Sequence, residues 1–259
     1  MSVALQIEDL SKHYDGIVAV DNVNFAIKLK TITGIFGENG AGKTTFFNLI
    51  SGYEMPDKKR IRLNLRFIEL PVYTPVSSIK IFDKNADLLT VRERCLLGLG
   101  RLFQKPRVFN ELTVIENLLM SNKPIKKNSL LVFLFKYRVV KRAKIINSIK
   151  AVKLLKEFSL YSKKDDKAFK LSFGERKLLS LCCLMMNNSK LVLLDEPFAG
   201  INTMMIKKLI NLIKHYKNKG VAFLIIEHKY NILADLCDYI YEMKSGKINL
   251  SHINRLTSY

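Results

Sequence analysis

The sequence predicts an α/β fold, in which a mixed sheet flanked by helices carries an antiparallel β lobe and an inserted α-helical lobe. Three observations predict it. A glycine-rich loop at residues 37–44 stands between an apolar run and a helical pattern. Two short runs, residues 191–194 and 222–226, are apolar throughout, which is typical of buried parallel strands. Residues 114–158 repeat apolar side chains at helical spacing.

The elements around the glycine-rich loop follow in order. Residues 3–7 predict a strand, and residues 19–27 predict another in which polar and apolar side chains roughly alternate. The apolar run 32–36 predicts the strand that leads into the loop, and residues 44–51 predict a helix that ends near Gly52. The loop therefore has a strand before it and a helix after it.

The pattern changes after this helix. From Lys58 to about Lys84, short β-branched and aromatic runs are separated by Pro71 and Pro75, which favours antiparallel strands. Each of the two late apolar runs is followed by a segment that predicts a helix.

These segments predict one domain over residues 1–259. Its core comprises residues 1–57 and 187–259, the β-lobe insert covers about 58–90, and the helical lobe covers about 105–186.

Composition excludes several classes of protein. The chain has 259 residues and is 48% hydrophobic, enough for a sizeable core. Its strongest apolar run, Leu130 to Phe135, is far shorter than the roughly 18 to 20 residues that a membrane-spanning helix needs. The first ten residues show no basic segment followed by an apolar one, so we do not expect export of the protein. We expect it to lie in the cytoplasm.

Net charge and cysteine content distinguish less well between possible partners and functions. A formal net charge of +20 suits nucleic acid, ribosome or anionic lipid equally well, and the lysines are spread along the chain. The four cysteines, Cys95, Cys182, Cys183 and Cys237, lack paired C-x-x-C spacing. We expect reduced structural thiols, with zinc as the remote alternative.

Residues 37–44 read Gly-Glu-Asn-Gly-Ala-Gly-Lys-Thr, a complete G-x-x-x-x-G-K-[ST] phosphate-binding loop. Glycines let successive backbone N–H groups converge on phosphate oxygens, and the start of the following helix adds its positive dipole end. Lys43 is expected to reach the β- and γ-phosphates, and the Thr44 hydroxyl to contact Mg²⁺. The sequence therefore predicts a nucleotide site.

Acidic residues after the first of the two late strands predict hydrolysis and not binding alone. Asp195 ends the apolar run 191–194, where its carboxylate can join the Mg²⁺ shell, and Glu196 can polarise a water molecule. His228 follows the run 222–226, where it can donate to the γ-phosphate. The plainer interpretations are a helix-capping Asp-Glu pair and a packed histidine.

A second anion-binding helix start is predicted at Ser172 and Gly174, ahead of a helix through Leu178 to Met186. Two such starts are more than one ATP needs from a single chain. If two chains meet head to tail, each supplies this start to the γ-phosphate bound by the other.

Together these motifs resemble the ATP-binding cassette ATPase of an ABC transporter, in order and over nearly the whole chain. The resemblance is carried by the phosphate loop, by the signature Leu171 to Glu175, by Leu191 to Glu196 and by the loop Ala199 to Asn202. Gln104 resembles the glutamine of the family's glutamine loop.

The resemblance implies that Tyr14 stacks on adenine, that Glu196 is the general base and that His228 is the switch histidine. It implies Mg²⁺ as cofactor, a second ATPase subunit, transmembrane permease subunits and no nucleic acid. It also implies a peripheral location on the cytoplasmic face of the inner (plasma) membrane. The implied site residues are, for nucleotide binding, Tyr14, Gly37, Glu38, Asn39, Gly40, Ala41, Gly42, Lys43, Thr44 and Thr45; for the metal, Thr44, Gln104 and Asp195; for catalysis, Glu196 and His228; and for the signature in trans, Leu171, Ser172, Phe173, Gly174 and Glu175.

Within the family, residues 100–109, 112–118, 198–202 and 226–228 are similar to the ATPases of branched-chain amino acid and urea-type importers. Similar sequences also serve lipopolysaccharide export, so cargo and direction stay open. The transmembrane subunit is expected to contact Pro106 to Phe109 and the stretch Lys123 to Lys144, with the lobe core as the alternative place for Leu130 to Phe135.

The chain departs from the family pattern at several places. The signature has Phe173 and Glu175 where the common form is Leu-Ser-Gly-Gly-Gln, and Glu175 can weaken closure or point toward Arg176. Asn202 replaces the usual Asp, and residues 58–78 are extra sequence without a functional account. Two alternative functions stay open: an ABC-type ATPase that acts on nucleic acid or ribosomes, and a non-hydrolysing regulatory cassette.

Overall fold

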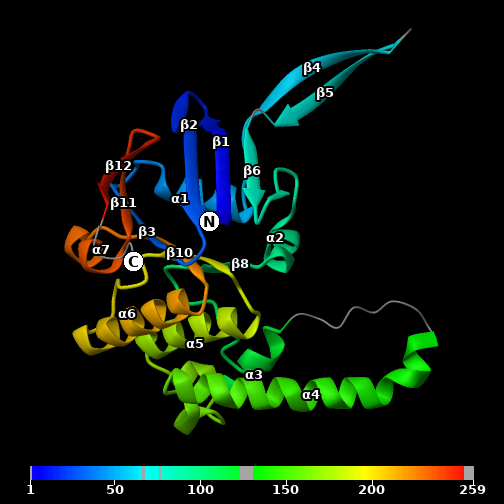
Figure 1. The fold of residues 1–259 in the computed structure, drawn as a ribbon, viewed down its shortest axis with the longest axis vertical. Coiled ribbons are helices and arrows are strands. Elements are labelled where there is room, and N and C mark those ends of the chain that lie inside the picture. The colour runs from blue at the N-terminus through cyan, green and yellow to red at the C-terminus, as the bar shows by residue number, and fades with distance from the viewer. Residues whose placement is uncertain (1, 66–67, 76, 123–130, 254–259) are drawn as a thin grey trace. The chain divides into compact units, whose positions relative to one another are not determined.

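The computed structural model describes residues 2–65, 68–75, 77–122 and 131–253, which divide into two compact units. The first unit comprises residues 1–101, 190–197 and 213–259, and the second comprises residues 102–189 and 198–212. Figure 1 shows the elements of both units along the colour-coded chain. The finer boundaries predicted from the sequence for the core and the two lobes stay a prediction.

The first unit contains a mixed six-stranded sheet with the order β12-β11-β3-β10-β9-β8. Neighbouring strands β11, β3, β10 and β9 are parallel, and β12 is antiparallel to β11. Strands β9 and β10 are buried at every position, as the continuous apolar runs predict. The strands are β3 (Ile32–Phe36), β8 (Leu99–Leu102), β9 (Leu191–Asp195), β10 (Ala222–Ile226), β11 (Tyr239–Lys244) and β12 (Lys247–Ile253).

A four-stranded antiparallel sheet with the order β2-β1-β6-β7 completes the sheets of the unit's core. It contains β1 (Val3–Tyr14), β2 (Ile17–Lys28), β6 (Ser78–Ile81) and β7 (Lys84–Asn85). The sequence assigns the first two strands to the core and the last two to the β lobe. The structure joins them in one sheet, because β1 pairs with β6 from Leu5 opposite Ile81 to Glu8 opposite Ser78.

The extra segment forms a separate two-stranded hairpin. Strand β4 (Lys58–Leu65) pairs antiparallel with β5 (Ile68–Pro75), with Lys58 opposite Pro75 and Leu65 opposite Ile68. Figure 1 shows the hairpin in cyan as a ribbon that leads into β6. The prediction of antiparallel strands in this part of the chain is confirmed.

Helix α1 (Lys43–Ser51) belongs to the core shared by the two sheets. Its side chains Phe46, Phe47, Leu49 and Ile50 are fully buried in one apolar cluster with residues of both sheets. The helix ends at Gly52, whose φ of 78° lets its N–H turn back to the last carbonyls. The unit also contains α2 (Val91–Leu97) and α7 (Tyr230–Leu236).

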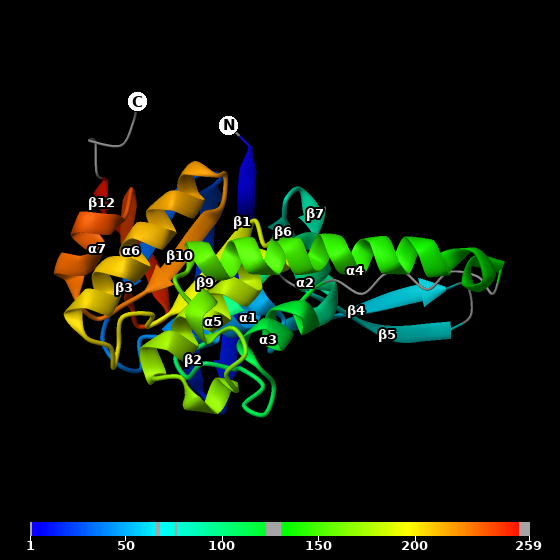
Figure 2. The same cartoon turned by 90° about the horizontal axis from the view of Figure 1, so that it is seen from below.

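The second unit is mainly helical and contains α3 (Val114–Met120), α4 (Leu131–Glu157) and α5 (Phe173–Met186), which pack against one another (Figure 2). Short 3₁₀ turns cover Tyr161–Lys163 and Ala168–Lys170. Helix α6 (Thr203–Asn218) begins in this unit and ends in the first. Among the described residues, no helix is long and apolar enough to span a membrane.

Candidate nucleotide site

The register of the parallel strands places three predicted motifs at one edge of the sheet. Ile226 lies opposite both Ile35 and Asp195, so the carboxyl ends of β3, β10 and β9 are level. The phosphate loop follows β3, Glu196 follows β9, and His228 follows β10 within two residues. Ligands of α/β sheets bind at this edge, because loops from several strands converge there.

Two glycines of the phosphate loop are required by close backbone contacts. A Cβ atom at Gly42 would lie 2.0 Å from the carbonyl oxygen of Ala19, and one at Gly37 would lie 2.2 Å from that of Met243. Gly42 also has a φ of 103°, in the left-handed region that favours glycine. The loop thus has a shape that no larger residue can adopt at these positions.

Lys43 holds this loop from inside. Its Nζ donates to the carbonyl oxygens of Gly37 at 2.8 Å and Glu38 at 2.7 Å. Burial lowers the pKa of Lys43 from its ordinary value, while the nearby carboxylates of Glu196 and Asp195 act in the opposite direction. The ammonium group therefore binds the loop and interacts electrostatically with both predicted acidic residues.

A pocket of about 210 Å³ opens over the loop. The residues that line it are Ile17, Ala19, Asn39, Gly40, Gly42, Lys43, Thr44, Thr45, Glu196, Ile226 and His228. Most of the predicted phosphate-contacting residues and both predicted catalytic residues therefore face one space. The arrangement suits an anion next to an activated water molecule.

Glu196 and His228 form a pair within this pocket. Oε1 of Glu196 lies 3.0 Å from Nε2 of His228. Glu196 has a φ of 43°, which is uncommon for a residue with a side chain, and its N–H donates to the carbonyl of Ile226 at 3.0 Å. The neighbouring strand β10 thus stabilises the unusual backbone conformation of Glu196 at the end of β9. In this conformation the carboxylate of Glu196 lies next to the ring of His228.

Asp195 ends β9 and forms an ion pair that sequence reasoning missed. Nη2 of Arg101 lies 2.8 Å from Oδ2 of Asp195, and the two side chains are only 6% and 13% exposed. No signal in the sequence marked this pair, because strand β8, in which Arg101 lies between the buried residues Gly100 and Leu102, was itself not predicted. A charged side chain in a buried strand usually has a partner.

Thr44 and Asp195 are both placed in the first unit, at the end of the sheet that carries the loop. A threonine hydroxyl and an aspartate carboxylate are hard oxygen donors of the kind that Mg²⁺ prefers. This donor set fits the predicted metal. Gln104, the third predicted metal residue, is exposed and belongs to the second unit.

Tyr14 lies at the end of β1 and is 38% exposed. Its hydroxyl donates to Oε2 of Glu54, and the Lys12 ammonium lies 5.2 Å from its ring centroid. Ile17 and Ala19, from the following strand, line the loop pocket instead. Stacking of Tyr14 on adenine stays a prediction.

The signature lies at the start of α5, in the second unit. Ser172 is the N-cap residue, and its hydroxyl accepts from the N–H of Glu175 at 3.3 Å while Glu175 accepts from the N–H of Ser172 at 2.9 Å. This reciprocal capping box fixes the helix start that the sequence predicts.

Glu175 also forms an ion pair with Lys163, whose Nζ lies 2.6 Å from Oε1. Burial opposes ionisation of Glu175, but the hydrogen bonds from Lys163 and Ser172 outweigh it and lower its pKa. The departure from the usual glutamine is therefore a charged helix cap paired with Lys163, and not a residue that points toward Arg176.

The other signature residues are set by packing within the second unit. A Cβ at Gly174 would lie 3.0 Å from Cγ of Met205, so glycine lets α5 approach α6 closely. Phe173 lies over Gly200, and the buried Lys177 donates to the carbonyl of Ala199 at 2.8 Å. These contacts join the signature to the loop after β9.

Asn202, which replaces an aspartate of the family pattern, caps α6. Its Oδ1 accepts from the N–H of Met205 at 2.9 Å. The short polar side chain therefore keeps the capping function that an aspartate would supply.

Three of the four cysteines have thiols that are shielded from water. Cys182 and Cys237 are almost fully buried, which raises their pKa values, and burial raises the pKa of Cys183 to about 12. These three thiols therefore stay protonated at neutral pH. The described residues contain no group of side chains suited to hold zinc.

Comparison with known proteins gives one family. Residues 20–199 match the family described as ABC transporter. The chain is 32% identical over 246 residues to a probable branched-chain amino acid transport ATP-binding protein LivG of Archaeoglobus fulgidus, covering 94% of this chain and 87% of the relative. It is 30% identical over 243 residues to the high-affinity LivG of Escherichia coli K12, covering 93% and 88%.

A lipopolysaccharide export system ATP-binding protein, LptB of Acidithiobacillus ferridurans, is 29% identical over 248 residues, covering 96% of this chain and 89% of the relative. Among solved structures, a nucleotide-free ATP-binding cassette from an ABC transporter superposes with a TM-score of 0.77 at 28% identity, covering 97% of this chain and 92% of that one. A cassette in its ADP conformation gives 0.75 at 27% identity, covering 96% and 90%.

These relatives are named as ATP-binding proteins of transport or export systems, so a function on nucleic acid or ribosomes is not favoured. The family match spans more than half of the chain, and both LivG relatives cover over nine tenths of it at 30% identity or more. The chain therefore belongs to the ABC transporter family, as an ATP-binding and ATP-hydrolysing subunit.

Proposed function

We propose that this subunit uses Mg²⁺ and ATP to drive import of branched-chain amino acids or similar small solutes through membrane permease subunits. The observation that carries the hydrolytic part is the Glu196–His228 pair, 3.0 Å apart in the pocket above the phosphate loop. The names of the LivG relatives support the cargo class.

In this proposal the loop N–H groups and Lys43 bind the β- and γ-phosphates. Lys43 would exchange its two carbonyl partners for phosphate oxygens, because an ammonium ion favours the anion over a neutral carbonyl. Thr44, Asp195 and Gln104 would hold Mg²⁺, which neutralises charge that develops on the transferred phosphoryl group. Tyr14 would stack on adenine.

Glu196 would accept a proton from the attacking water, and His228 would hold that water against the γ-phosphate. The partner subunit would supply its Ser172 and Gly174, and the rest of the signature, at the helix start of α5. Ser172 is exposed at a helix terminus that the capping box orders, which supports this role. ATP would thus close a head-to-tail dimer, and hydrolysis would reopen it.

The second unit offers a surface for the permease. Ile145, Ile146 and Ile149 of α4 are each more than half exposed, and Phe109 is 62% exposed. The predicted contact stretch, Lys123 to Lys144, begins outside the described residues, and its run Leu130 to Phe135 lies outside those whose side chains are described. Exposed apolar side chains on this helix favour a protein contact, which would hold the subunit on the cytoplasmic face of the membrane.

The variant Glu196→Gln tests the hydrolytic assignment. It should bind ATP as the wild type does and accumulate as a dimer in size-exclusion chromatography, while steady-state hydrolysis falls by roughly 100-fold or more. Hydrolysis at the wild-type rate would exclude Glu196 as general base.

The cargo is tested with the complex purified from native membranes and reconstituted in proteoliposomes. ATP-dependent uptake of labelled leucine, lost with Glu196→Gln, would support import of amino acids. ATP-dependent extraction of a lipid without uptake would instead support an exporter.

A further inference from the structure

Arg101 is a buried cation next to the predicted metal ligand, and the motifs above give it no role. It lies in β8, three residues before Gln104, and it is the last residue of the first unit before the chain enters the second. Its side chain is 6% exposed. Burial of a guanidinium group is costly unless several acceptors surround it.

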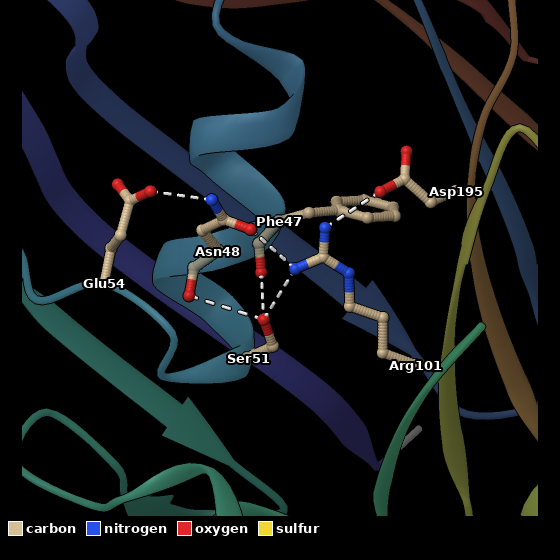
Figure 3. Close-up of polar contacts among 6 residues, drawn as sticks. All are labelled: Phe47, Asn48, Ser51, Glu54, Arg101 and Asp195. Atoms are coloured by element: carbon tan, nitrogen blue, oxygen red, sulfur yellow. Dashed lines mark hydrogen bonds and ion pairs between the residues drawn. The ribbon is translucent and has the colours of Figure 1, made fainter. Parts of the chain in front are cut away.

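The surrounding acceptors come from α1 and β9 (Figure 3). Nη1 donates to Oδ1 of Asn48 at 2.7 Å and to Oγ of Ser51 at 3.0 Å, and Nη2 donates to Oδ2 of Asp195 at 2.8 Å. Ser51 in turn donates to the carbonyl of Phe47 at 2.6 Å. The guanidinium fork is thus fixed by the helix that begins at Lys43, and it reaches the carboxylate with a defined orientation.

The contacts continue beyond Arg101 toward the other end of the predicted nucleotide site. Nδ2 of Asn48 donates to Oε1 of Glu54 at 2.7 Å, and Glu54 accepts a hydrogen bond from the hydroxyl of Tyr14. One continuous network therefore joins Tyr14, the predicted adenine-stacking residue, to Asp195.

We propose that Arg101 is a positioning residue that acts as the resident counter-ion of Asp195 and orients this carboxylate for the metal shell. The ion pair uses Oδ2, and Figure 3 shows the other carboxylate oxygen pointing away from the guanidinium. The inference rests on the proposed role of Asp195 in holding Mg²⁺.

The proposal has a consequence that simple structural support would not have. Arg101 and Mg²⁺ both compensate the negative charge of one largely buried carboxylate, so the presence of either cation reduces the electrostatic attraction of the site for the other. Removing the arginine leaves the nucleotide-free site more negative, and Mg²⁺ should then gain affinity. The carboxylate loses its fixed orientation at the same time, so hydrolysis should slow.

The experiment measures binding of a fluorescent, non-hydrolysable ATP analogue to the full chain as a function of Mg²⁺ concentration. In Arg101→Met the half-saturating Mg²⁺ concentration should fall by about 3- to 10-fold. Mg²⁺ with the analogue should also raise the melting temperature of this variant more than that of the wild type. An unchanged or raised Mg²⁺ midpoint would overturn the proposal.

Arg101→Lys keeps the charge but loses the fork. It should keep the Mg²⁺ midpoint within about twofold of the wild type while kcat falls by roughly tenfold at a similar KM for ATP. Wild-type kcat in this variant would overturn the orienting role, even if Arg101→Met fails to fold. Arg92→Met, at an exposed arginine on α2, is the matched control.

Asp195→Asn separates this inference from the proposed function. If Mg²⁺ strengthens analogue binding as much in this variant as in the wild type, Asp195 does not hold the metal, and the basis of the inference fails. If Asp195→Asn loses the Mg²⁺ effect but Arg101→Met matches the wild type, the inference alone fails.

Discussion

Arg94 offers a direct test of how the phosphate-loop helix is stabilised. Its side chain is fully buried, and Nη1 donates to the carbonyls of Leu49 at 2.5 Å and Ile50 at 2.8 Å in the last turn of α1. Nε donates to the carbonyl of Leu89 at 3.0 Å. Burial lowers the pKa of Arg94 to about 10, with Asp87 acting in the opposite direction. The guanidinium group therefore donates hydrogen bonds to carbonyls at the C-terminal end of α1, where the helix dipole is negative.

Arg94→Met keeps the length of the side chain but removes every donor. The two carbonyls of α1 then remain buried without this donor, which costs about 1 to 3 kcal/mol of stability for each. Part of this loss is offset because the variant no longer has to remove a guanidinium group from water on folding. We expect a net decrease of about 2 to 4 kcal/mol in the free energy of unfolding. That corresponds to a melting temperature lower by roughly 4 to 16 °C for a domain of this size.

Urea unfolding followed by circular dichroism measures this change, with Arg92→Met on the exposed side of the same helix as control. The loss should persist at high salt, because most acceptors of Arg94 are neutral carbonyls that salt does not screen. A variant within about 0.5 kcal/mol of the wild type would refute the reasoning.

Two further predictions concern the loop and the signature. Gly42→Ala should weaken nucleotide affinity by more than about tenfold in a fluorescence titration, because its Cβ would lie 2.0 Å from the carbonyl oxygen of Ala19. Gly16→Ala is the control: Gly16 also has a positive φ, of 90°, but a Cβ there would meet open space, so nucleotide affinity should not weaken. Glu175→Gln should be less stable than the wild type at pH 7, because it loses the ion pair with Lys163. The difference in stability should vanish as the pH falls from the ordinary glutamate pKa of 4.5 through the lower pKa of Glu175 in the folded protein, since protonation then removes the ion pair from the wild type as well. A difference that grows on acidification would contradict the second prediction.

Local patterns accounted for much of the candidate site. The phosphate loop, the strand that ends at Asp195 and the helix that starts at Ser172 are each defined by a few consecutive residues, and the structure has the corresponding elements. Such elements are predictable because glycine conformation, apolar continuity and helix capping act over short distances along the chain. The roles assigned to these residues stay predictions.

Elements with weak local signals were missed. The short strand β8 and the C-terminal hairpin of β11 and β12 were not predicted, because their residues have mixed polarity and form no continuous apolar run. The pairing of β1 with β6 was also missed, since it joins residues that are seventy or more positions apart in sequence.

By itself, the sequence determined the fold class, the order of the motifs and the family to which the chain belongs. Only the tertiary structure decided which side chains compensate the buried charges. Arg101 meets Asp195 across 94 residues, and Arg94 meets Leu49 across 45. The physical reason is that a buried cation takes whichever acceptors the packing of distant strands and helices brings within reach, and no local pattern records that choice.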